Sequence, residues 1–425
     1  MLSKERMEEY AAILRAELVP ALGCTEPIAV ALAAAKARAV LGAFPERAEI
    51  WCSGNIVKNV KGVTVPNTGG LKGLDAAAIA GIVGGDPDRG LEVLESLGAR
   101  PEAHAEIARL RDAGFCPAGL LEGEEGLHIV AKAWAGGSSA EVHLRSTHSN
   151  ICLIVKDGAT LLEKSEELAR PQSADEDPLN VRDILEFADS VELAVVEGPL
   201  SAQVEMNTAI SDEGLRGDYG VGVGKTLLKS YGGDVANRAK ARAAAGSDAR
   251  MSGCALPVVI NSGSGNQGMT VSLPVIEYAK ELGSPRERLL RALAVSNLVA
   301  IHQKRRIGRL SAYCGAVSAA CGSGAGIAYL HGGGYEEVSD TIINTIANVG
   351  GMVCDGAKPS CAAKIASAVD AAIMAYHMSV EGKVFGEGEG LVEGGVEGTI
   401  DRVGRMGRVG MRSTDLEILA MMLGK

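Results

Sequence analysis

The sequence has 425 residues, of which 47% are apolar and 22% charged, a composition that excludes a largely disordered or collagen-like chain. Its 53 acidic and 42 basic residues give a formal net charge of −11, which opposes non-specific binding to nucleic acid or anionic lipid. Aromatic residues make up only 3%, so stacking platforms for single-stranded nucleic acid are scarce. We therefore expect a small-molecule partner, and neither nucleic acid nor a membrane.

The first residues, MLSKERMEEYAAILRAELVPALG, predict a helix over 1–20 that Pro20 ends. Glutamates interrupt its apolar positions, unlike the core of a secretory signal, so we expect a cytoplasmic protein. A second helix is predicted directly afterwards, with Thr25 as its cap and Pro27 in its first turn. Cys24 would then lie at or just before the start of that helix.

Strands and hairpins are predicted at 48–65 and 127–156, which are rich in Val and Ile, with a helical stretch at 89–113 between them. The polar, Pro-bounded segment PQSADEDP at 171–178 is the best candidate for a linker. Beyond it the pattern changes to helices, predicted at 179–190, 198–215, 221–246, 270–282, 285–303, 337–348, 362–378 and 414–423.

These elements predict an α+β fold class. An N-terminal α/β domain, residues 1–178, would contain mostly antiparallel strands and carry Cys24. A larger, mainly α-helical domain would span residues 179–425 and contain most of the glycine-rich loops.

Three glycine-containing segments invite a ligand-binding interpretation. GVGVGKT at 220–226 resembles a phosphate-binding loop, but Tyr219 occupies the position of that motif's first glycine, so a helix start is the better interpretation. SGSGNQG at 262–268 precedes a helical stretch, so its backbone N–H groups could face a carboxylate, although a flexible turn has the same pattern. The polar residues of 54–70 fit either substrate contacts or a solvated strand face.

The chain has nine cysteines without regular spacing, which favours metal binding, catalysis or core packing over a disulfide framework. Cys354 and Cys361 flank a Gly- and Pro-containing segment that cannot stay helical but can bring two sulfurs together. Cys314 and Cys321, if helical, would lie about 10 Å apart along the axis, so Cys321 is expected in the core. A three-thiolate iron–sulfur cluster and plain burial of the thiols both remain open.

Cys24 has a different setting, in LGCTEP before a predicted helix. The exposed N–H groups and positive end of a helix lower a thiol pKa and favour the thiolate, which can take a proton. A thiol that only packs at a helix start fits the same pattern.

Five motifs in order resemble the L-cysteine desulfidase family, a group similar to the α part of iron–sulfur L-serine dehydratases. They are LGCTEP at 22–27, SGNIVKNVKGVTVPNTGG at 53–70, SGSGNQG at 262–268, SAYCGAVSAACGSGAG at 311–326 and GMVCDGAKPSCAAK at 351–364. The resemblance covers nearly the whole chain and implies cleavage of L-cysteine to pyruvate, ammonia and sulfide by α,β-elimination.

On matching positions, the resemblance implies a [4Fe–4S] cluster held by Cys314, Cys354 and Cys361, with one iron open, and Cys24 as the proton acceptor. The iron–sulfur L-serine dehydratases have a longer insert between the last two cysteines, so the short DGAKPS segment favours the desulfidase branch. Removing a weakly acidic Cα proton and expelling a poor leaving group needs a base on one side and a Lewis acid on the other, which agrees with this set.

The substrate carboxylate needs hydrogen-bond donors, and the candidates are the SGSGNQG backbone, Asn266, Lys61 and Lys358. His302 and Lys304 are weaker candidates, because a basic stretch such as IHQKRRIGR is usually a solvated helix end. His148 in STHSN fits either a hydrogen bond in the site or a strand cap.

Several alternatives stay open at this point. An L-serine dehydratase would use the same scaffold, a non-catalytic cluster protein would act as a redox or cysteine sensor, and a zinc protein would use the same thiolates. The expected partner is an amino acid substrate, and the sequence is also compatible with a homodimer.

Overall fold

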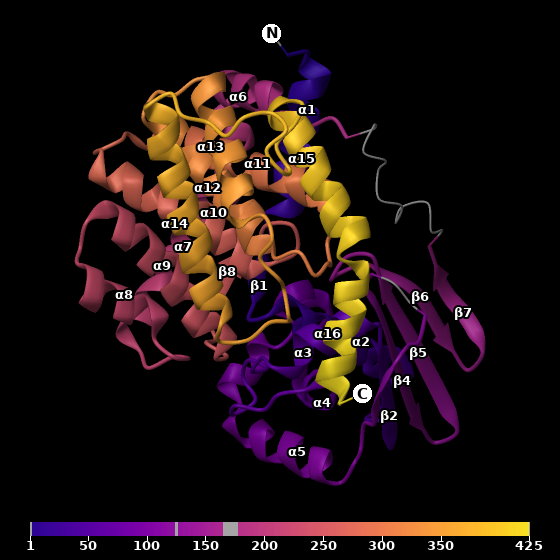
Figure 1. The fold of residues 1–425 in the computed structure, drawn as a ribbon. Helices are drawn as coiled ribbons and strands as arrows, with labels where there is room; N and C mark the ends of the chain where they lie inside the picture. Colours follow the sequence, from indigo (N-terminus) through magenta and orange to yellow (C-terminus); the bar gives the residue numbers. More distant parts are fainter. Residues whose placement is uncertain (1, 124–125, 165–176, 425) are drawn as a thin grey trace.

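The computed structural model describes residues 2–123, 126–164 and 177–424, and it is an α+β protein, as predicted. Figure 1 shows a sheet with several N-terminal helices beside it, and a bundle of helices from the second half of the chain. The strands are β1 (Pro20–Leu22), β2 (Arg47–Cys52), β3 (Ala118–Leu120), β4 (His128–Ala135), β5 (Ser138–Arg145), β6 (Ile151–Lys156), β7 (Ala159–Glu163) and β8 (Pro257–Val259).

Helices make up most of the remaining structure. In the N-terminal part they are α1 (Lys4–Glu17), α2 (Thr25–Leu41), α3 (Gly54–Lys61), α4 (Leu74–Gly84) and α5 (Pro101–Asp112). In the rest of the chain they are α6 (Val181–Ser190), α7 (Glu197–Arg216), α8 (Val223–Tyr231), α9 (Val235–Met251), α10 (Gly265–Glu281), α11 (Arg286–Ile307), α12 (Gly315–Leu330), α13 (Tyr335–Val349), α14 (Cys361–Val380), α15 (Gly395–Arg405) and α16 (Arg412–Leu423).

The six-stranded sheet has the order β3-β2-β4-β5-β6-β7, and every neighbouring pair is antiparallel except the parallel pair β2–β3. This confirms the mostly antiparallel prediction. Helix α2 covers β4 and β5 and is buried along most of its length, since its sequence is mainly Ala, Val, Ile and Leu. Small aliphatic side chains thus build the core where aromatic residues are scarce.

One predicted strand is wrong, and the error matters for the site. The strand expected over 48–65 ends at Cys52, and the chain turns into helix α3 after Ser53. Ile56, Val57 and Val60 are buried together on one side of that helix, a spacing that suits a helical turn better than strand alternation. The β-branched residues alone had favoured a strand, and packing of the amphipathic face overrides that preference.

Other predictions need smaller corrections. The helix expected over 221–246 is two helices, α8 and α9, because Gly232 has a φ of 88° and Asp234 caps the second helix. The stretch 89–113 contains two short 3₁₀ turns before α5, and α15 was not predicted. Residues 171–176 of the expected linker lie outside the described residues, so the domain boundary near 178 stays a prediction.

Of the contacts between the N-terminal residues and the second half, two bear directly on the site. Strand β1 pairs antiparallel with β8, so that Leu22 lies opposite Pro257. Figure 1 shows α16 running alongside α3, where Leu419 fills the space that a side chain at Gly54 would need. These contacts place Cys24, α3 and the 262–268 segment at the same end of the helical bundle. Among the described residues, no helix has both the length and the apolar character required to cross a bilayer.

Candidate active site

One pocket contains four of the cysteines that the sequence singles out. Cys24, Cys314, Cys354 and Cys361 all line a cavity of about 100 Å³ between the two parts of the molecule. The structure therefore brings together the residues that the resemblance implied as ligands and base. Cys321, by contrast, is fully buried in α12 and packs in the main core, which confirms its expected place.

Backbone hydrogen bonds hold the cysteines of the second half in place. Cys314 is the N-cap of α12, and Cys361 is the first residue of α14. The Cys354 N–H donates to the Ala312 carbonyl over 2.7 Å, and the Cys314 N–H donates to the Met352 carbonyl over 3.0 Å. This pairing of two loops fixes the Cys314 and Cys354 side chains relative to each other.

The charges around these sulfurs favour a thiolate at Cys354. A hydrogen bond from the Cys314 thiol, helped by the nearby Lys58 and Lys304 ammonium groups, lowers the pKa of Cys354 to about 5. The same hydrogen bond raises the pKa of Cys314, and burial raises the pKa of Cys361. These shifts favour a thiolate at Cys354 and protonated thiols at Cys314 and Cys361.

Lys304 is a buried lysine beside the Cys314 and Cys354 sulfurs. Its side chain is only 4% exposed, and no carboxylate of the described residues forms an ion pair with it. Burial lowers the pKa of Lys304 to about 8, while the Cys354 and Cys314 sulfurs oppose that effect. The expectation of a solvated helix end is therefore wrong here. A buried lysine without a carboxylate partner favours anionic sulfur beside it.

The donor set fits the cluster that the resemblance implied. Three thiols converge on one cavity, and two buried lysines compensate the charge that their deprotonation would create. The described residues contain no close group of three or more His, Cys, Asp or Glu side chains of the kind that holds a single metal ion. A cluster would need the sulfurs to be farther apart than a single ion does, because each thiolate would bind a different iron.

Cys24 lies on another side of the same pocket, as the N-cap of α2. Its thiol donates to Glu26 Oε2 over 3.1 Å, and Asn59 Nδ2 donates to Glu26 Oε1 over 3.0 Å. The His148 ring nitrogen Nε2 stands 3.6 Å from Glu26 Oε1, a close contact beyond hydrogen-bond length. Glu26 is thus surrounded by three polar groups of the pocket.

The expected low pKa of Cys24 is wrong. Burial raises the pKa of the Cys24 thiol well above its usual value, and the Glu26 carboxylate raises it further. Burial alone would also raise the pKa of Glu26, but its His148 and Cys24 neighbours outweigh that effect and lower it to about 2. The resting pair is therefore a thiol and a carboxylate, because the helix terminus is too weak to overcome desolvation and a neighbouring negative charge.

Only one of the three side chains predicted to bind substrate lies in the pocket. Asn266 lines the pocket, whereas Lys61 and Lys358 are not among its lining residues. Lys61 lies on the outer side of α3 and donates to the Met422 carbonyl. Lys358 donates to the Asp355 and Gly356 carbonyls at 2.9 and 3.1 Å, so it stabilises the turn between two cysteines.

Sequence reasoning missed several residues of the pocket. Glu26 was visible in LGCTEP but had no assigned role, and Lys58 was not singled out. Asn55 and Asn59, two of the polar residues of 54–70 considered as substrate contacts, do line the pocket. Arg250 had no signal beyond its position at the end of a long Ala-rich helix.

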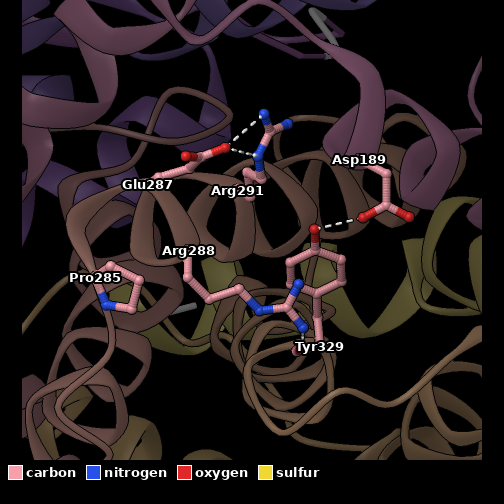
Figure 2. A pocket seen from close by; sticks show the side chains of 6 residues that line it. All are labelled: Asp189, Pro285, Glu287, Arg288, Arg291 and Tyr329. Carbon is pink, nitrogen blue, oxygen red and sulfur yellow. Dashed lines mark hydrogen bonds and ion pairs between the residues drawn. The ribbon is translucent and has the colours of Figure 1, made fainter.

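A second, more open pocket has no comparable chemistry. Figure 2 shows its lining side chains engaged with one another: the Tyr329 hydroxyl donates to Asp189 over 2.6 Å, and Arg291 is paired with Glu287. Arg288 stacks on the Tyr329 ring, 4.0 Å from its centroid. These side chains hydrogen-bond, pair or stack with one another, so this pocket is a weaker candidate for an active site.

The family of the chain follows from comparison with known proteins. The family described as serine dehydratase alpha chain matches residues 88–420, which include Cys314, Cys354 and Cys361. The chain therefore belongs to the serine dehydratase alpha chain family, and this membership indicates a lyase of the serine dehydratase type.

Relatives extend the similarity to the whole chain. A UPF0597 protein of Lachnoclostridium phytofermentans is 56% identical over 411 residues, covering 97% of this chain and 98% of the relative. A UPF0597 protein of Desulfitobacterium hafniense is 52% identical over 419 residues, covering 98% and 97%. A third, of Treponema denticola, is 47% identical over 430 residues, covering 99% of each chain. The chain is thus similar to these proteins on both sides of the pocket.

Proposed function

We propose that this protein is an iron–sulfur-dependent lyase that converts L-cysteine and water to pyruvate, ammonia and sulfide. The observation that carries the proposal is the single pocket lined by Cys24, Cys314, Cys354 and Cys361. Membership of the serine dehydratase alpha chain family supports the reaction class. The short segment between Cys354 and Cys361 supports L-cysteine as the preferred substrate.

Cys314, Cys354 and Cys361 would hold a [4Fe–4S] cluster. When bound, the cluster would supply an open iron that acts as a Lewis acid toward the leaving sulfur. Lys58 and Lys304 stabilise the thiolate forms that the ligands need, because their ammonium groups lie beside Cys354 in a buried site.

Cys24 is the group that we assign to removal of the Cα proton. It must first lose its own proton, and the Glu26 carboxylate already accepts a hydrogen bond from its thiol. Because burial raises the pKa of Cys24, its thiolate is a stronger base than an exposed cysteine once formed. Asn59 holds Glu26 in place through the second carboxylate oxygen.

The remaining steps balance without another reactant from the protein. Loss of the Cα proton and cleavage of the C–S bond give aminoacrylate and sulfide. Aminoacrylate tautomerises to an imine, and water hydrolyses the imine to pyruvate and ammonia.

The test is anaerobic purification followed by assay with L-cysteine. We expect about four irons per chain, in line with the cluster that the family resemblance implies, and equal amounts of sulfide and pyruvate. An intact cluster without elimination from L-cysteine or L-serine would refute the enzyme assignment and favour a cluster-containing sensor. Zinc in place of iron, without visible charge-transfer absorption, would refute the cofactor.

The family match favours L-serine dehydratase as a second candidate function. The two functions differ in the leaving group, hydroxide or sulfide, on one scaffold. Comparison of kcat/KM for L-serine and L-cysteine separates them, since a soft sulfur leaving group is better matched to iron–sulfur chemistry. A higher value for L-serine would replace the desulfidase proposal.

A further inference from the structure

Arg250 is a buried cation of the active-site pocket whose Nη2 amino group has no partner among the described residues. Its side chain, at the end of α9, is only 2% exposed. Nε donates to the Gly23 carbonyl over 2.9 Å, and Nη1 donates to Asn266 Oδ1 over 3.1 Å. Nη2 has no hydrogen-bond partner among the described residues, and no carboxylate lies within ion-pair distance of the guanidinium. A buried guanidinium in this state calls for an anion.

The start of α10 lies directly against this guanidinium. A Cβ atom at Gly265 would come within 2.4 Å of Arg250 Nε, so only glycine lets the helix start approach the cation this closely. The first N–H groups of α10 have no intrahelical acceptor, and the helix dipole adds positive potential at the same place. Ser264 caps the helix and also lines the pocket. Two independent sources of positive charge therefore meet at one wall of the cavity.

The position of this wall relative to Cys24 defines what kind of anion fits. Arg250 binds the carbonyl of Gly23, the residue directly before Cys24. In an α-amino acid, the carboxylate carbon is bonded to Cα, so a carboxylate held by Arg250 brings the Cα proton next to the Cys24 sulfur. A more distant anchor, such as Lys61 outside the pocket, would not constrain Cα in this way.

We propose that Arg250, together with the first turn of α10, binds the α-carboxylate of the amino acid substrate and thereby positions Cα at Cys24. The inference rests on the proposed function for the identity of the substrate as an amino acid. It replaces Lys61 and Lys358 as carboxylate partners and gives Asn266 an indirect role, since its side-chain oxygen orients the guanidinium.

The test measures binding of L-alanine and L-alaninamide to the anaerobic holoenzyme by calorimetry. Both keep the ammonium group and lack a leaving group, and only L-alanine has a carboxylate. We expect the wild-type protein to bind L-alanine about 10- to 100-fold more tightly, the range for a hydrogen bond to a charged group. In Arg250→Gln the ratio should fall to about one, and KM for L-cysteine should rise by a similar factor with a smaller change in kcat.

Two further variants protect the test against misfolding of Arg250→Gln. Asn266→Asp leaves the arginine in place but sets a carboxylate against Nη1, so it should also abolish the preference for L-alanine. Arg250→Lys keeps the charge and should retain part of the preference. The matched control is Arg288→Gln, which removes an arginine of the open pocket in Figure 2 and should leave the ratio unchanged.

The result that overturns the inference is a preference for L-alanine that persists in folded, iron-containing Arg250→Gln or in Asn266→Asp. Absence of any preference in the wild-type protein overturns it as well. Failure of the proposed function looks different, because wild-type protein would then discriminate the two ligands normally and release neither sulfide nor pyruvate.

Discussion

Two thiols of one pocket are set in opposite protonation states by their neighbours. Cys354 lies beside the Cys314 thiol and the Lys58 and Lys304 ammonium groups, and its pKa falls to about 5. Cys24 lies beside the Glu26 carboxylate, and burial with that charge raises its pKa well above the usual value. Burial raises the pKa of both thiols. At Cys354 the hydrogen bond from Cys314 and the nearby ammonium groups outweigh that effect, whereas at Cys24 the Glu26 carboxylate adds to it.

The opposite pKa shifts of Cys354 and Cys24 suit the two thiols to separate tasks. A thiol held as thiolate is prepared to ligate metal, whereas a thiol held protonated can deliver or exchange a proton. The family match covers the first side and begins only at residue 88, while the side with Cys24 is shared with the full-length relatives. The following substitutions test this division, from the largest expected effect to the smallest.

Removing a proposed ligand should have the largest effect. Cys354→Ala should lose the cluster, because two thiols no longer suffice to hold it, and activity should fall below detection. Iron analysis and visible absorption after anaerobic reconstitution measure the loss. Cys152→Ser, which changes a cysteine of β6 outside the pocket, should keep full iron content. Equal iron in both variants would remove Cys354 from the ligand set.

Removing the proposed base should abolish turnover without affecting the metal. Cys24→Ala should lower kcat by about 10²- to 10⁴-fold, the usual contribution of a positioned proton acceptor. Iron content and absorption should match the wild-type protein, which separates this variant from Cys354→Ala. A variant that retains wild-type kcat would show that another group removes the Cα proton.

Removing the charge of Lys304 should weaken cluster binding by the cysteines around Cys354 and leave Cys24 unaffected. Lys304→Met keeps much of the buried volume but removes the charge that stabilises the Cys354 thiolate. We expect affinity for the cluster to drop by about 10- to 100-fold, as for other groups that support metal ligands. The rate of iron release to a chelator measures this change. An unchanged rate would mean that Lys58 alone sets the charge balance.

Removing the carboxylate next to Cys24 should shift a pH profile. The Glu26 charge contributes to the raised pKa of Cys24, so Glu26→Gln should lower that pKa. Since the base must be deprotonated, the ascending limb of kcat against pH should move to lower pH. A limb that stays in place would show that Glu26 does not act on Cys24.

Substitution of His302 should have the smallest effect, and it should change the stability of the fold rather than the chemistry of the pocket. His302 is fully buried between Asp177 and Glu397, with its Nε2 at 2.7 Å from Glu397 Oε2. Burial alone would lower the pKa of His302, but hydrogen bonds to the two carboxylates outweigh it and raise the pKa. The expectation of a solvated site for His302 is therefore wrong too.

The sign of the His302 contribution follows from the raised pKa. The stabilisation is fully present below the unfolded pKa of about 6.5 and is lost as pH rises through the higher folded pKa. His302→Gln should therefore lower the free energy of unfolding by about 1–3 kcal/mol at pH 6 and by less at pH 9. Urea unfolding at the two pH values measures the difference, and an equal loss at both would contradict it.

The sequence predicted the fold class, the helix that begins after Cys24 and the core position of Cys321. These features depend on local signals: a cap with a proline in the first turn, and helical spacing. The convergence of Cys24 with the other three cysteines came from the resemblance, because pairing of β1 with β8 has no local signature at three residues per strand.

The errors in the site have a common physical origin. Lys61 was chosen over Lys58 because nothing in the sequence shows that Lys58 is buried against the pocket while Lys61, at the last position of α3, is exposed and bonded to the Met422 carbonyl. The pKa of Cys24 was misjudged because a helix terminus is visible in a sequence while burial and the contact with Glu26 are not. Lys304 was assigned to solvent because a basic run gives no sign that one of its members is buried.

The contact of α16 with α3 links the charge balance of the pocket to a helix that does not line it. Lys58, which supports the Cys354 thiolate, is paired with Asp415, and Leu419 packs against Gly54. A substitution in α16 that loosens this packing would therefore shift the ammonium group beside Cys354 without touching any side chain of the cavity.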